Sequence, residues 1–78
     1  MKLVKLNKTH NLYHHKCTHA FKFYMQYDLG AIRIRNALID MYGRDDSIWK
    51  TFRSSHRRYW IGVTDEKYLT LILLKLDN

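Results

Sequence analysis

The sequence contains no proline, only three glycines and a single cysteine among its 78 residues. One cysteine, Cys17, excludes a disulfide within the chain, so extra support for so small a core would have to come from a metal or a partner subunit. No apolar run approaches the roughly 18–20 residues that a membrane span needs. The first residues lack the apolar region of a signal peptide, and a free thiol suits a reducing compartment, so we expect a cytoplasmic location.

Acidic residues are scarce. Seven Asp and Glu stand against fourteen Lys and Arg, which gives a formal net charge of +7. The imbalance is concentrated in residues 1–27 and 47–63, neither of which contains an acidic residue. We expect the fold to bring these two segments together into one basic surface whose partner is an anion, and nucleic acid is the abundant cytoplasmic anion. The alternative is that the basic residues only form a solvated surface.

Apolar and polar residues alternate in three stretches, which predicts strands over residues 2–6, 19–27 and 57–63. A helix is the alternative for residues 19–27. Residues 7–18 are polar and without periodicity, which predicts a loop. Residues 48–53 fit either a strand or one short helical turn.

Residues 29–42 have the spacing of a helix. Ile34 and Leu38, with further apolar residues three and four positions apart, form one apolar stripe. Asp28 offers an N-cap oxygen to the first backbone N–H groups, and Gly43 can adopt the left-handed conformation that closes the last turn. The sequence therefore predicts a helix over residues 29–42.

Residues 68–76 are predicted to form a returning strand after a hairpin loop at 64–67, with a C-terminal helix as the alternative. With this hairpin the fold is α+β, a single small basic domain over residues 1–78. One amphipathic helix packs on a small antiparallel sheet of four or five strands.

One helix covers only one face of such a sheet. The other face of the predicted hairpin carries a tryptophan and three leucines, which would be an exposed apolar patch of the kind that marks an interface. We therefore expect a homodimer. The expected interface residues are Trp60, Leu69, Leu71 and Leu73.

Five potential metal ligands lie close together in the sequence: His10, His14, His15, Cys17 and His19. Imidazole and thiolate are the ligands that zinc prefers, but their spacing here matches no standard zinc finger or ribbon. We expect a polar loop that faces RNA, with no metal and no cofactor.

A second group of residues suits a metal-free ribonuclease, in which His56 and Tyr59 act as base and acid and nearby arginines stabilise the charged phosphorane. Residues 56–66, followed by 69–74, resemble the closing hairpin of RelE-type messenger-RNA-cleaving toxins. Those toxins place two helices after the first strand, whereas this sequence predicts a strand before a single helix. No carboxylate accompanies His56, so we expect a protein that is not an enzyme.

Basic residues alternate with aromatic residues in both acid-free segments. Lys and Arg neutralise phosphates, while aromatic faces stack on unpaired bases. This combination predicts a non-catalytic RNA-binding protein with modest sequence preference. DNA is the alternative ligand, because positive charge alone does not distinguish RNA from DNA. The expected binding residues are Lys22, Tyr24, Lys50, Arg53, Arg57 and Arg58.

A second functional class is an interaction factor that inhibits a nucleic-acid enzyme such as a nuclease, as antitoxins and phage counter-defence proteins do. Small size and an apolar surface suit this class. The two classes are compatible, because such a factor can bind an enzyme together with its RNA.

Overall fold

Four strands, two α-helices and one 3₁₀ turn build the part of the chain that the computed structural model describes, residues 2–54 and 58–77. They follow the chain in the order β1 (Lys2–Lys5), η1 (Asn11–His15), β2 (His19–Phe23), α1 (Leu29–Tyr42), β3 (Trp49–Ser54), β4 (Arg58–Val63) and α2 (Glu66–Asp77). The strands form one antiparallel sheet in the order β1-β2-β4-β3. The predicted α+β class is confirmed.

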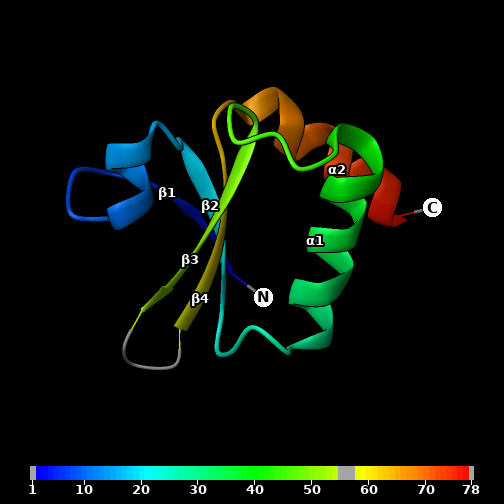
Figure 1. Ribbon diagram of the computed structural model, residues 1–78, viewed down its shortest axis with the longest axis horizontal. Helices are drawn as coiled ribbons and strands as arrows, with labels where there is room; N and C mark the ends of the chain where they lie inside the picture. Colours follow the sequence, from blue (N-terminus) through cyan, green and yellow to red (C-terminus); the bar gives the residue numbers. More distant parts are fainter. Residues whose placement is uncertain (1, 55–57, 78) are drawn as a thin grey trace.

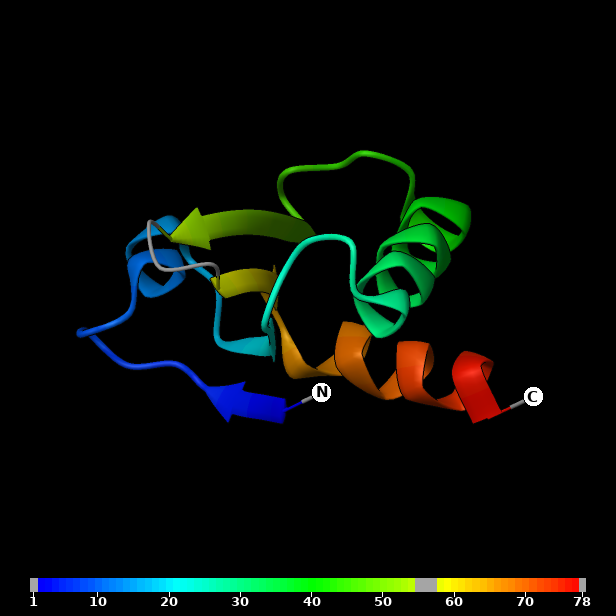
Figure 2. The same cartoon turned by 90° about the horizontal axis from the view of Figure 1, so that it is seen from below.

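The structure has three layers (Figure 1). Helices α1 and α2 lie on one side of the sheet, and the segment that carries η1 lies on the other. Figure 2 shows the two helices next to each other beyond the strands, in agreement with the contacts between them. We call the side of the sheet that faces away from α1 and α2 the outer face. Among the residues described, no helix has the length and apolar character needed to cross a membrane.

Helix α1 has the predicted bounds, with the predicted Asp28 cap at its start and Gly43 at its end, where the positive φ is combined with an extended ψ of −161°. The Asp28 carboxylate accepts a hydrogen bond from the Gly30 backbone N–H at 2.8 Å. At the other end Gly43 has φ +67°, and its backbone N–H donates to the Ile39 carbonyl at 2.7 Å. The stripe residues Ile34 and Leu38 are buried against the sheet.

The C-terminal segment is a helix, so the expected strand at 68–76 and hairpin loop at 64–67 are wrong. The Asp65 carboxylate accepts a hydrogen bond from the Lys67 backbone N–H at 2.9 Å, which caps the first turn of α2. Leu69 and Ile72 lie three residues apart and are both buried in the core with α1. A helix buries both side chains on one side, whereas a strand would have placed them on opposite faces. The fold therefore has two helices where the sequence predicted one.

The other predicted strands are present with shorter bounds. The stretch predicted at 19–27 ends as a strand at Phe23, and the ambiguous residues 48–53 form strand β3. Alternate residues of the two central strands, including Phe21, Tyr59 and Ile61, point toward the helices and form the main core.

A smaller core lies on the outer face, beneath the segment that was predicted as a loop. Leu12 of η1 and Cys17 pack there on Ala20 and on the backbone of Gly62. A Cβ atom at residue 62 would lie 2.9 Å from Leu12 Cδ1 and 3.0 Å from Cys17 Sγ. Glycine is needed at this position because the covering segment approaches the strand so closely.

Candidate nucleic-acid interface

One row of side chains crosses all four strands on the outer face. Lys2 pairs with Lys22, Lys22 pairs with Trp60, and Trp60 pairs with Phe52. Directly paired residues of an antiparallel sheet project from the same face, so two cations and two aromatic rings stand next to one another. The two aromatic rings of the row, Trp60 and Phe52, pack against the small core that contains Leu12 and Cys17.

At the centre of this row, the Lys22 ammonium group contacts the Trp60 ring. Lys22 Nζ lies 5.2 Å from the centroid of the Trp60 ring, within the range of a cation–π interaction. The His10 ring, from the segment before η1, approaches the same tryptophan with a centroid distance of 5.6 Å and an interplanar angle of 60°. Trp60 therefore has a cation and an imidazole as neighbours while its side chain stays partly exposed.

Basic residues from both acid-free segments meet beside this row. Lys2, Lys22 and Arg58 line a shallow hollow of about 320 Å³ together with Tyr24. Tyr24 directly follows β2, and its side chain is 69% exposed. The hollow thus combines three cations with an accessible aromatic ring, and it contains no acidic side chain among its lining residues.

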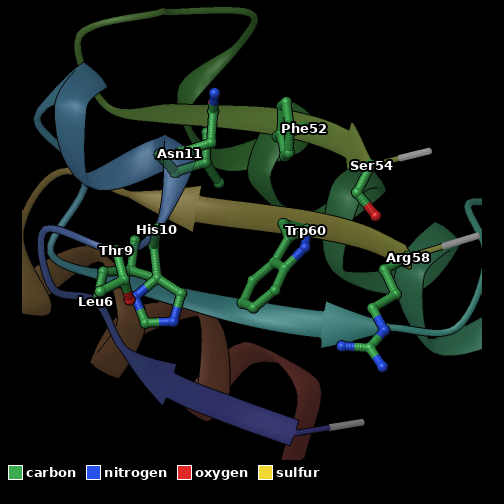
Figure 3. Close-up of a pocket in the computed structure, with 9 residues that line it drawn as sticks. Leu6, Thr9, His10, Asn11, Phe52, Ser54, Arg58 and Trp60 are labelled. Carbon is green, nitrogen blue, oxygen red and sulfur yellow. The ribbon is translucent and has the colours of Figure 1, made fainter. Parts of the chain in front are cut away.

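A deeper pocket of about 440 Å³ lies on the other side of Trp60. Figure 3 shows Trp60 on β4, with His10 on one side and Arg58 on the other. Ser54 also lines the pocket, and its Oγ is buried without a hydrogen-bond partner among the residues described. The full lining consists of Leu6, Thr9, His10, Asn11, Leu12, Phe52, Ser54, Arg58 and Trp60.

The six predicted binding residues do not all lie together. Lys22, Tyr24 and Arg58 line the basic hollow. Lys50 pairs with Gly62 at the end of the outer face that η1 covers, and Arg53 pairs with Tyr59 on the helix-covered face. Arg57 lies outside the residues that the structure describes.

The four predicted interface residues are also separated. Trp60 lies on the outer face of the sheet, whereas Leu69 is 5% exposed and belongs to the main core. Leu71 and Leu73 are exposed on α2. The predicted hairpin face that would have carried all four residues is not formed, because the three leucines belong to helix α2.

The ribonuclease alternative loses its hairpin and its candidate acid. Residues 69–74 belong to α2, so the segment that resembled a returning toxin strand is helical. Tyr59 is 7% exposed and packs in the main core. His56 lies outside the described residues.

The histidines near Cys17 serve local structure. His10 Nδ1 accepts the Asn7 backbone N–H at 3.0 Å, and His14 Nε2 lies 2.8 Å from the Lys8 carbonyl. The Cys17 side chain is 1% exposed, and this burial raises the pKa of its thiol, although nearby Lys50 acts in the opposite direction. Within residues 2–54 and 58–77, no three His, Cys, Asp or Glu side chains are arranged to hold a metal ion.

Three residues of this surface were not among those predicted. Lys2 and Phe52 join it through strand pairing, whose register the alternation of apolar and polar residues does not give. His10 belongs to a segment without periodicity, so no sequence signal connected it with Trp60.

Searches against protein-family models, curated proteins and solved structures found no match for this chain. The geometry of the outer face is therefore the basis on which a function is proposed.

Proposed function

We propose that this chain is a non-catalytic RNA-binding protein that holds single-stranded RNA across the outer face of its sheet. The observation that carries the proposal is the row of Lys2, Lys22, Trp60 and Phe52, with its cation–π contact at 5.2 Å. Cations that neutralise phosphates stand here beside rings that stack on bases.

Single strands fit this surface better than duplexes. Bases in a duplex are stacked on one another, whereas unpaired bases can lie on an aromatic side chain. Tyr24 and Trp60 are the rings available for stacking. Tyr24 lines the basic hollow with Lys2, Lys22 and Arg58, and Lys22 also contacts the Trp60 ring. RNA is the proposed ligand, and DNA of the same sequence is the comparison to make.

The test is the affinity for a fluorescently labelled single-stranded RNA, measured by anisotropy over a series of salt concentrations. If Lys2, Lys22 and Arg58 each engage one phosphate, log K falls with log salt at a slope near −2. For the double variant Lys22→Met/Arg58→Gln, the magnitude of this slope should fall by more than half. The matched control, Arg33→Gln/Arg35→Gln on α1, removes the same formal charge from another element and should keep it.

Absence of binding, or binding that is indifferent to salt, would contradict the proposal. Equal losses in the two double variants would also contradict it, because that result indicates attraction by net charge without a defined surface.

We further propose that the protein is a homodimer in which the outer side of α2 contacts a second copy. Leu71 and Leu74 lie three residues apart on α2 and are 46% and 58% exposed. Exposed leucines at helical spacing suit pairing with an identical helix. Light scattering should give twice the chain mass, and Leu71→Glu/Leu74→Glu should give a folded monomer. A wild-type monomer at micromolar concentration would contradict this part of the proposal.

A second candidate function is inhibition of a nucleic-acid enzyme. The observation that favours it is the start of α1, where Tyr27 just before the helix and Leu29 at its first position are 74% and 79% exposed. Large apolar side chains exposed together are typical of protein interfaces. A pull-down should then retain a nuclease after RNA digestion, and Tyr27→Ser/Leu29→Ser should release it. Loss of the nuclease on RNA digestion would reject direct inhibition.

A further inference from the structure

We propose that the pocket beside Trp60 binds one unpaired nucleotide, with its base against the indole and its phosphate on Arg58. This inference rests on the proposed RNA binding and adds a defined site for a single nucleotide. The pocket volume of about 440 Å³ lies within the range of small-molecule sites, which is about 300–1,000 Å³.

The walls of the pocket suit a flat heterocycle. Leu6, Leu12 and Phe52 provide apolar surface, and Trp60 provides a wide ring. A predominantly apolar lining with a few polar groups is the usual composition of a small-ligand site.

The segment that forms one wall is held in place by its own hydrogen bonds. The Asn7 side chain accepts hydrogen bonds from the Thr9 backbone N–H at 2.9 Å and from its hydroxyl at 2.5 Å. His10 Nδ1 accepts the Asn7 backbone N–H, so a neutral His10 carries its proton on Nε2. The wall therefore needs little ordering when a ligand enters, which lowers the free-energy cost of binding.

Two polar side chains are available to contact the edge of a base. The Thr9 hydroxyl already donates to Asn7, whereas Ser54 Oγ is buried without a partner among the described residues. A buried hydroxyl without a partner is unfavourable, and rotation of the Ser54 side chain toward the pocket would let a ligand atom pair with its Oγ and remove the penalty. Asn11 is exposed at the pocket rim, and its amide offers both a donor and an acceptor to a base.

Arg58 connects this pocket with the basic hollow, because it lines both. A phosphate on Arg58 would therefore belong to the nucleotide in the pocket, and the neighbouring phosphate would reach Lys22 or Lys2. The shared arginine fixes where the base leaves the strand and enters the pocket.

The test compares the four ribonucleoside 5′-monophosphates with ribose 5-phosphate, which carries the same phosphate and no base. Binding of every compound to every variant is measured by isothermal titration calorimetry, and quenching of Trp60 is followed in the Trp49→Phe background, where Trp60 is the remaining tryptophan. At least one nucleotide should bind about tenfold or more tighter than ribose 5-phosphate and quench Trp60. Trp60→Tyr should keep the preference for a base, and Trp60→Leu should abolish it.

Asn11→Ala and Ser54→Ala provide a second readout. Both should change the order of preference among the four bases while leaving the affinity for ribose 5-phosphate unchanged. Equal affinity for all five compounds, with RNA binding intact, would contradict the proposal that the pocket binds a base, while the proposed RNA binding would stand. Failure of RNA and of all five compounds to bind would overturn both.

Discussion

Lys22 Nζ lies 5.2 Å from the Trp60 ring centroid, across the two central strands of the sheet. The two residues belong to different acid-free segments, and their contact brings those segments together on one face. A lysine above an indole places a cationic group beside an aromatic surface, which is the combination that a phosphate and an adjacent base would meet.

Removing the Lys22 charge should weaken the salt dependence of RNA binding. Lys22→Met is expected to reduce the magnitude of the log K against log salt slope by about 0.7, which corresponds to one phosphate contact on a single strand. Lys67→Met is the matched control, because Lys67 Nζ also lies 5.2 Å from an aromatic centroid, that of Tyr68 on α2. An unchanged slope for Lys22→Met would remove this lysine from the binding surface.

Gly62→Ala should destabilise the protein. The added methyl group would meet Leu12 Cδ1 at 2.9 Å and Cys17 Sγ at 3.0 Å, and such overpacking costs about 1–3 kcal/mol. Thermal unfolding should show a Tm lower by at least about 4 °C. In a Leu12→Ala background the same substitution should cost less, because the closest contact is gone. If the losses of stability caused by Gly62→Ala and Leu12→Ala simply add in the double variant, this explanation would be contradicted.

The thiol of Cys17 should be unreactive in the folded protein. Burial raises its pKa, so the thiolate that reacts with alkylating agents is scarce near pH 8. Iodoacetamide should react at least about tenfold more slowly than after unfolding in urea. Equal rates in the folded and unfolded states would show that the Cys17 thiol is accessible in the folded protein, which would contradict its burial.

The same pKa shift predicts a loss of stability at alkaline pH. A thiol whose pKa is raised by folding contributes stability below its ordinary pKa, about 9, and loses it as the pH rises through the folded value. Burial and Tyr68 raise the pKa of Tyr42 as well, so Cys17 and Tyr42 both lower the free energy of unfolding as the pH rises. Urea denaturation of Cys17→Ala should show a smaller fall in the free energy of unfolding between pH 8 and 10 than the wild type, and an equal fall would contradict the assignment.

The two helix caps should contribute similar stability. Asp28 and Asp65 each accept a backbone N–H of the following first turn, at 2.8 and 2.9 Å. Replacing either by alanine should cost about 1 kcal/mol in urea unfolding. Asp46→Ala, in the connection before β3, provides the control and should leave stability nearly unchanged.

Helix α1 was predictable because its signals are local: the Asp28 cap, the apolar stripe and Gly43. The sequence before α2 was ambiguous, since the polar residues 64–67 suit a hairpin loop as well as a helix start. Whether this segment forms a strand or a helix depends on the core, in which Leu69 and Ile72 both pack with residues of α1.

The outer face was predictable only in part. One cation from each acid-free segment, Lys22 and Arg58, lines the same hollow. The position of Arg53 depends on strand register, which places it with Tyr59 on the helix-covered face. His10 reaches Trp60 through the fold of a segment without periodicity, so long-range packing decides its place.

The most direct measurement compares Arg58→Gln with Arg53→Gln in their affinity for single-stranded RNA at one salt concentration. Both arginines are exposed on neighbouring strands, and they project from opposite faces of the sheet. Binding on the outer face predicts that Arg58→Gln lowers the affinity at least about fivefold, the loss of one charge-assisted contact, while Arg53→Gln leaves it unchanged. Equal losses for the two variants, or a loss confined to Arg53→Gln, would contradict binding on the outer face.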